Sequence, residues 1–130
     1  MNRLEAREEA LRLLYEADQA HRGPDLDSPE LSPRARHLVE GIWQHRAELD
    51  EALGRASARW RVERMPAVDR NVLRIGLYEL RYRPDTPVAV VISEAVRLAK
   101  AYSTERSGGF VNGVLGRLAD SERGETRHAK

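Results

Sequence analysis

The sequence contains no cysteine, few aromatic residues and no long hydrophobic run. The absence of cysteine excludes disulfides and thiolate metal sites. The longest apolar stretch, Val88–Ile92, is far shorter than the roughly 20 residues that cross a bilayer. The start of the chain, Met1–Glu5, is too charged for a signal peptide. We therefore expect one soluble domain of 130 residues, located in the cytoplasm and without membrane contact.

Residues that favour strands are also scarce outside 86–92, whereas Ala, Leu, Arg and Glu dominate and favour helices. Hydrophobic residues at helical spacing predict an all-α fold of six or seven helices. The predicted helical segments are 3–20, 33–60 with a break near 44–47, 68–80, 87–100 and 110–118. Ser32 is expected to cap the second helix, and residues 103–109 to form a turn.

The sequence divides into a predicted helical domain, residues 1–120, and a polar tail, residues 121–130, that we expect to be disordered. Glycine inside a helix costs roughly 1 kcal/mol relative to alanine. Gly113 and Gly116 lie within the last predicted helix, so they predict a close approach to another helix.

Charge is unevenly distributed, although the formal net charge is only +1. Residues 24–54 hold seven acidic and three basic side chains, whereas residues 55–83 hold eight basic and three acidic ones. Almost all basic residues are arginine, which suits phosphate recognition but is also common on ordinary helix surfaces. The asymmetry predicts either a face that attracts a polyanion or neighbouring helices whose charges pair.

Patterns typical of catalysis or metal binding are weak. The sequence has neither a P-loop nor a nucleophile elbow. His37 and Glu40 lie one helical turn apart and could supply two metal ligands, but exposed polar residues of a helix explain them better. Gly108 and Gly109 could offer backbone N–H groups to a phosphate, although such a pair is usually only a loop. We expect no enzyme activity, no metal site and no cofactor.

Four segments, in this order and spacing, resemble the NusB transcription antitermination family. They are Ala6-Arg7-Glu8 with Leu14-Tyr15, Asp69–Leu80, Ile92–Lys100 and Phe110–Leu115. The third segment is similar to the family pattern I-N-E-A-V-x-L-A-K, with Ser93 in place of the Asn. The resemblance spans residues 3–118 and implies a fold of two small helical bundles packed across each other.

The resemblance also implies a non-enzymatic protein that binds single-stranded boxA RNA together with ribosomal protein S10. This complex joins RNA polymerase in the antitermination complex on ribosomal RNA operons. The implied RNA-binding residues are Arg3, Arg7, Tyr15, Ser107, Gly109 and Phe110. The segment around Tyr78, Glu79 and Tyr82 is the candidate surface for S10.

Residue chemistry agrees with this assignment, but each site also has a purely structural interpretation. Arg3 and Arg7 share one helix face and can meet successive phosphates, or they can pair with neighbouring Glu side chains. Tyr15 and Phe110 can stack on unpaired bases, or they can belong to the core, which is the better interpretation for Phe110. Gly109 stands where the family often has Lys, which lowers the expected phosphate affinity.

Two other functions are compatible with the sequence. The first is the RNA-binding domain of a ribosomal RNA methyltransferase, which contains a related helical domain. The second is a structural helical dimer without a role in RNA binding, which would leave an apolar surface patch after packing. The sequence does not distinguish a monomer from a homodimer.

Overall fold

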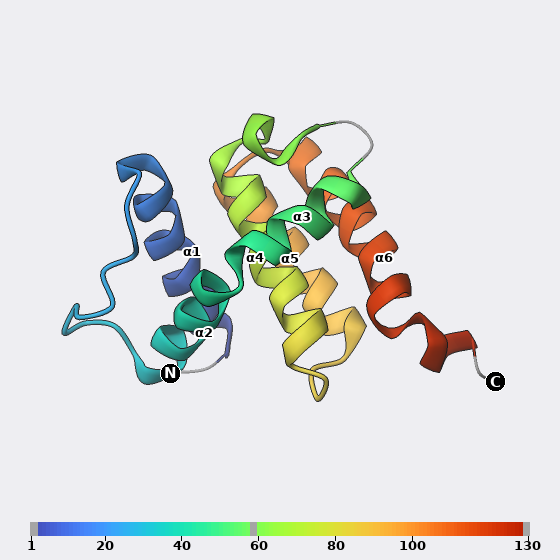
Figure 1. Cartoon of the computed structure of the whole chain (residues 1–130), viewed down its shortest axis with the longest axis horizontal. Coiled ribbons are helices and arrows are strands. Elements are labelled where there is room, and N and C mark those ends of the chain that lie inside the picture. Colours follow the sequence, from blue (N-terminus) through green and yellow to red (C-terminus); the bar gives the residue numbers. More distant parts are fainter. Residues whose placement is uncertain (1–2, 58–59, 129–130) are drawn as a thin grey trace.

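The computed structural model describes residues 3–57 and 60–128, and the side chains of residues 5–57 and 60–124. Within these ranges the chain forms six α-helices, one short 3-10 helix and no strand (Figure 1). The elements are α1 (Arg3–Ala20), α2 (Pro33–Gln44), α3 (Arg46–Ala56), η1 (Val62–Arg64), α4 (Ala67–Tyr82), α5 (Val88–Tyr102) and α6 (Glu105–His128). The all-α prediction is confirmed. None of these helices combines the length and the apolar character that a membrane span requires.

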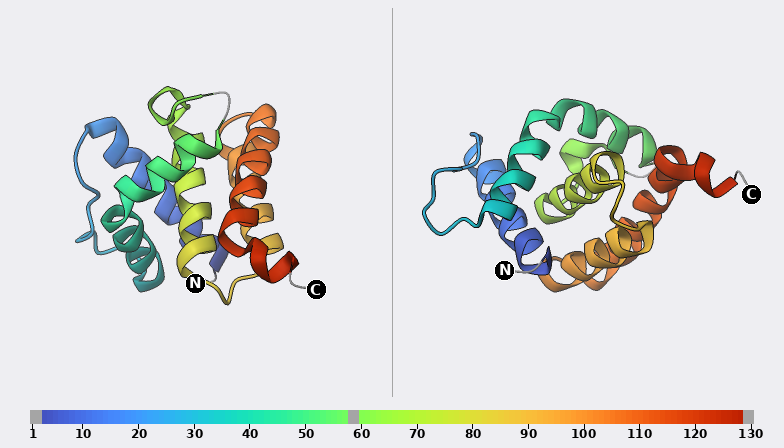
Figure 2. Two further views of the ribbon diagram at one scale, coloured as in Figure 1. Left: turned by 45° about the vertical axis from the view of Figure 1, so that its right-hand side comes forward. Right: turned by 90° about the horizontal axis from the view of Figure 1, so that it is seen from below.

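Helix α4 is the centre of the molecule. Every residue from 71 to 80 is buried, so this helix is enclosed on all sides. Helices α1, α2 and α3 pack on one part of its surface, and α5 and α6 pack on another. Seen from below, the other helices form a ring around α4 (Figure 2). The two helical groups therefore share one central helix.

The helix starts follow local signals in the sequence. The Ser32 hydroxyl accepts a hydrogen bond of 3.1 Å from the backbone N–H of Ala35, which confirms its predicted role as an N-cap. Pro33 occupies the first turn, where its missing N–H removes no helical hydrogen bond. The predicted break is also confirmed, because α2 ends at Gln44, α3 begins at Arg46, and His45 lies between them.

Helix α6 begins earlier than the sequence suggested. We expected a turn over residues 103–109, but the helix starts at Glu105 and includes Gly108 and Gly109. The hydroxyl of Thr104 accepts a 3.1 Å hydrogen bond from the backbone N–H of Ser107. This capping contact satisfies one free donor of the first turn and offsets the low helix propensity of the two glycines.

The same helix continues to His128, through the segment that we expected to be a polar tail. Two of its last described side chains bind α4. Glu122 pairs with Arg81 at 2.6 Å, and Arg123 donates hydrogen bonds of 2.6 to 3.0 Å to four backbone carbonyls at the end of α4 and in the following turn. These contacts explain why α6 extends past Ser121.

The prediction for the two glycines of the last helix is wrong. A Cβ atom built on Gly116 would meet nothing within 4 Å, and one on Gly113 would meet only Arg117 of the same helix. Close approaches occur elsewhere. A Cβ on Gly41 would collide with the Tyr78 phenol, and one on Gly76 would lie 2.7 Å from a methyl group of Leu115. Glycine therefore permits the packing of α2 on α4 and of α4 on α6.

Candidate nucleic-acid interface

Arg7 of α1 is buried in an ion pair with Glu79 of α4. Its Nε and Nη2 atoms donate to the two carboxylate oxygens, both at 2.7 Å, and the two side chains are only 7% and 6% exposed. The hydrogen bond to Glu79 raises the pKa of Arg7 above its usual value, although burial acts in the opposite direction. Arg3 is the first residue of α1, and its side chain lies outside the described residues.

Tyr15 lies on the other half of α1 and is 39% exposed. Its ring lines a groove of about 630 Å³ together with Leu11, Val68 and Tyr102. The Tyr102 hydroxyl donates a 3.1 Å hydrogen bond to Glu8, which ties the end of α5 to α1 and raises the pKa of Tyr102. The groove therefore presents two aromatic rings, with the carboxylates of α1 along one side.

The start of α6 places two of the predicted residues very differently. Ser107 is buried, and its hydroxyl contacts both carboxylate oxygens of Asp69 at 3.0 and 2.9 Å. This contact joins the first turn of α6 to the first turn of α4. Gly109 is exposed, and a Cβ atom there would meet nothing within 4 Å. A larger residue such as lysine would therefore fit at position 109.

Phe110 packs partly against the core and partly against the indole of Trp60, with 5.2 Å between the ring centroids. Trp60 is 38% exposed. Trp60 was not among the predicted site residues, although an aromatic residue among the arginines of the 55–64 segment was a detectable signal.

The candidate partner segment has one buried tyrosine, Tyr78, and one half-buried tyrosine, Tyr82. The Tyr82 hydroxyl donates a 2.5 Å hydrogen bond to Glu48, which raises the pKa of Tyr82. Its ring stacks on His45 with 4.4 Å between centroids. Glu79 and Tyr82 line a cleft of about 560 Å³ between α1, α2 and the turn that follows α4.

The predicted RNA-binding residues fall into two groups along α4. Tyr15 lies beside Val68, and Ser107 contacts Asp69, so Tyr15 and the start of α6 meet at the beginning of α4. Arg7 instead binds Glu79, ten residues further along α4, a separation of about 15 Å at 1.5 Å per residue. The structure brings Tyr15 close to the α6 residues but keeps the Arg7 guanidinium apart from them.

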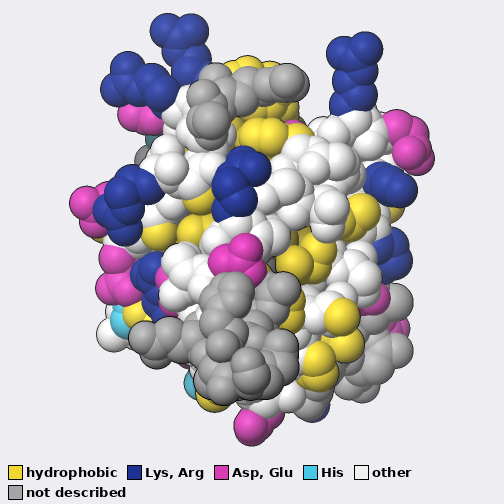
Figure 3. All heavy atoms as spheres, turned by 90° about the vertical axis from the view of Figure 1, so that its right-hand side faces the viewer, with side chains coloured by type: hydrophobic (Ala, Val, Ile, Leu, Met, Phe, Trp, Pro, Cys, Tyr) yellow, Lys and Arg dark blue, Asp and Glu magenta, His cyan; other side chains and the backbone are white. Residues whose placement is uncertain are grey.

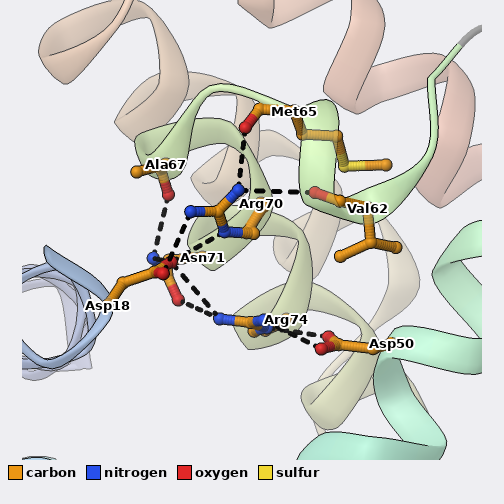
Figure 4. A network of polar contacts seen from close by, with 8 residues as sticks. All are labelled: Asp18, Asp50, Val62, Met65, Ala67, Arg70, Asn71 and Arg74. Carbon is orange, nitrogen blue, oxygen red and sulfur yellow. Dashed lines mark hydrogen bonds and ion pairs between the residues drawn. The ribbon is translucent and has the colours of Figure 1, made fainter. Parts of the chain in front are cut away.

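Two arginines of the basic segment lie inside a network between α1, α3 and α4 (Figure 4). Arg70 binds Asp18 at 2.7 Å and the carbonyl of Met65 at 2.9 Å, and Arg74 binds Asp50 at 2.8 Å. The expected pairing between the acidic and basic segments is confirmed for Arg74. The basic charge of α4 is thus largely neutralised within the protein.

Metal ligands are not clustered in the part of the chain that the structure describes, since no three His, Asp or Glu residues there are placed to hold an ion. The ring of His37, one of two candidate ligands, instead contacts the guanidinium of Arg83 at 3.1 Å.

Comparisons with known proteins identify the family. The NusB family profile matches residues 4–120. The transcription antitermination protein NusB of Myxococcus xanthus is 47% identical over 111 residues, which cover 85% of this chain and 77% of that protein.

Two solved structures show the same fold. NusB of T. maritima superposes with a TM-score of 0.83 at 33% identity, covering 92% of both chains. A chain from the crystal structure of antitermination factors NusB and NusE in complex with dsRNA superposes with a TM-score of 0.77 at 28% identity, covering 93% of this chain and 99% of that one. On sequence and structure together, this chain belongs to the NusB family.

Proposed function

We propose that this protein is a transcription antitermination factor that binds unpaired boxA-type RNA together with ribosomal protein S10. The relatives are named for antitermination, and a structural neighbour comes from a complex with NusE and RNA. The observation that carries the proposal is the exposed ring of Tyr15, held beside the start of α6 at one end of α4. Exposed aromatic rings let unpaired bases stack without dependence on their sequence.

In this proposal the residues predicted from the sequence have different roles. Tyr15 and Phe110 supply rings, and Gly109 leaves the backbone of α6 open to the strand. Ser107 fixes the start of α6 on α4 through Asp69. Arg7 holds α1 against α4 through its ion pair with Glu79. We assign it no phosphate contact, because such a contact would require this ion pair to open. Arg3 remains a candidate for phosphate contact.

The S10 surface is proposed at the cleft beside α4, which is lined by the half-buried Tyr82 and by the buried Glu79. The proposed role is binding, without catalysis, and a role in transcription places the protein in the cytoplasm. The chain covers most of the length of its antitermination relatives. These relatives are named transcription antitermination proteins, which favours antitermination over the methyltransferase-domain alternative.

A binding experiment with S10 present tests the proposal. Fluorescence anisotropy of labelled boxA-type RNA should show tighter binding than a scrambled RNA of the same composition. Tyr15→Ala should weaken binding about tenfold, since stacking on one ring contributes roughly 1–3 kcal/mol, whereas Tyr15→Phe should retain most of the affinity. Equal affinity for both RNAs would show that the proposed function is wrong. Light scattering on the same samples would then show whether the protein is instead a structural dimer.

A further inference from the structure

The face formed by α6 carries an aromatic pair, of which Phe110 was predicted to bind RNA and Trp60 was not. Hydrophobic side chains appear in several places on this face, and the patch at its upper end has Lys and Arg side chains on either side (Figure 3). Trp60 and Phe110 lie at the start of α6, with their rings tilted by 51° and their centroids 5.2 Å apart. Phe110 is partly buried against the core, and Trp60 is 38% exposed. The indole is thus braced on one side and open on the other.

The backbone next to the indole is held near the end of α3, and the end of α3 is held on α6. The backbone N–H of Trp60 donates a 3.2 Å hydrogen bond to the Ser57 hydroxyl. The Nε of Arg117, on α6, donates a 2.9 Å hydrogen bond to the carbonyl of Ala56. These bonds tie the end of α3 to the helix that carries Phe110 and the backbone of Trp60 to the end of α3, and the indole itself contacts Phe110. A ring held in this way loses little freedom when a ligand stacks on it.

Two exposed arginines each lie four residues along the chain from one member of the aromatic pair. Arg106 and Phe110 are four residues apart on α6 and therefore share one face of that helix. Arg64 is the last residue of η1, the short helix that begins two residues after Trp60. Both guanidinium groups are exposed, and neither pairs with a carboxylate among the described residues, whereas Arg61 has only a 3.9 Å contact with Glu63. Unpaired guanidinium groups beside an open ring match the phosphates and bases of a single strand.

A series of neighbouring residues connects the Tyr15 groove to the aromatic pair. Val68 lines that groove, the adjacent Asp69 binds Ser107, and Ser107 lies one turn before Phe110. A strand that stacks on Tyr15 would reach the indole by crossing the start of α6.

We propose that Trp60 is a second base-stacking surface of the RNA interface, braced by Phe110 and flanked by Arg64 and Arg106. An unpaired RNA strand then runs from Tyr15 across the start of α6 to the segment before η1. This inference rests on the proposed function and adds to it the direction of the strand and a residue that binds a base.

The two tryptophans allow a direct measurement. Trp43→Phe leaves Trp60 as the only tryptophan of the chain. BoxA-type RNA is titrated into this variant with S10 present, and the emission is compared with the same mixture without RNA. We expect the emission of Trp60 to be quenched with the same midpoint as the anisotropy of labelled RNA. In the chain that keeps Trp43, Trp60→Ala should weaken RNA binding about tenfold, and Trp60→Phe should retain most of the affinity.

Matched variants separate this surface from general effects. Val90 is exposed to a similar extent, 39%, but lies on α5, and Val90→Ala should leave RNA affinity unchanged. Arg106→Gln should reduce the dependence of affinity on salt, whereas Arg55→Gln, which removes an arginine already paired with Glu51, should not.

Three outcomes would overturn the inference. In the first, RNA binds normally without quenching Trp60 emission, and Trp60→Ala keeps full affinity. That result would exclude Trp60 from the RNA interface and leave the proposed function intact. Quenching by S10 alone would make the surface a protein interface. The absence of any preference for boxA-type RNA by the wild type would reject the proposed function itself.

Discussion

Arg7 and Glu79 show how tertiary structure can change the interpretation of a single side chain. From the sequence, Arg7 is a surface cation with acidic neighbours on α1. In the structure its partner lies 72 residues away and both groups are buried. Local spacing could not indicate this pair, because it depends on how α1 packs on α4.

This burial predicts a large effect of Arg7→Ala on stability. The substitution leaves the Glu79 carboxylate buried without its partner, which typically costs 3–5 kcal/mol. Urea unfolding should show a loss of roughly this size. The matched control is Arg12→Ala on the same helix, which removes an ion pair with Glu16 whose side chains are 52% and 55% exposed. That variant should lose less than about 1 kcal/mol. Equal losses for the two variants would contradict the structural role of Arg7.

Among the helices, sequence signals located most boundaries but failed at α6. The Ser32 cap, Pro33 and the break at His45 could be predicted because each acts through neighbouring residues. The early start of α6 could not, because the low propensity of Gly108 and Gly109 is offset by Thr104 and by packing on α5.

The candidate site was predictable to the same limited extent. The resemblance supplied Tyr15 and Phe110, and both rings lie at one end of the molecule. Trp60 was missed because an aromatic residue among arginines does not by itself indicate the contact with Phe110, 50 residues further along the chain. The charge pattern also could not indicate which arginines are internal. Arg70 and Arg74 lie within the polar network, whereas Arg64 is exposed.

The end of α6 provides a test of where the folded domain stops. A chain ending at Gly124 keeps Glu122 and Arg123, so we expect its thermal stability to equal that of the full chain. A chain ending at Asp120 loses the ion pair with Arg81 and the hydrogen bonds to the end of α4. A guanidinium bound to helix carbonyls contributes about 2 kcal/mol, and the shorter chain should melt several degrees lower. Equal melting temperatures would place the boundary near residue 120 instead.

For the whole molecule, the network around Asp18 connects α1, α3 and α4. Burial alone would raise the pKa of Asp18, but hydrogen bonds from Arg70 and Asn71 and the charges of Arg70 and Arg74 outweigh it and lower the pKa. Between the folded and unfolded pKa values, the unfolded chain binds a proton at this group and the folded chain does not. The stabilisation is therefore present above about pH 4, the usual pKa of aspartate, and is lost as the pH falls through the folded pKa.

Asp18→Asn should consequently be less stable than the wild type near pH 7, by roughly 3 kcal/mol. The difference should shrink as the pH falls below about 4, because the wild type then loses the same charge. Free energies of unfolding in urea at several pH values would measure this trend. Asp85→Asn, in the exposed turn after α4, should follow the wild type at every pH. If the free energies of unfolding of Asp18→Asn and wild type differed by the same amount at every pH, the Asp18 carboxylate would be excluded as the acid-sensitive group.

The central position of α4 also determines how the protein loses its structure. Detachment of α1, α2 and α3 would expose one part of the α4 surface to water, and detachment of α5 and α6 would expose another. Neither group retains a complete hydrophobic interior without the other, because both complete it with the same helix. The chain should therefore melt in a single all-or-none transition, as one cooperative unit and not as two modules.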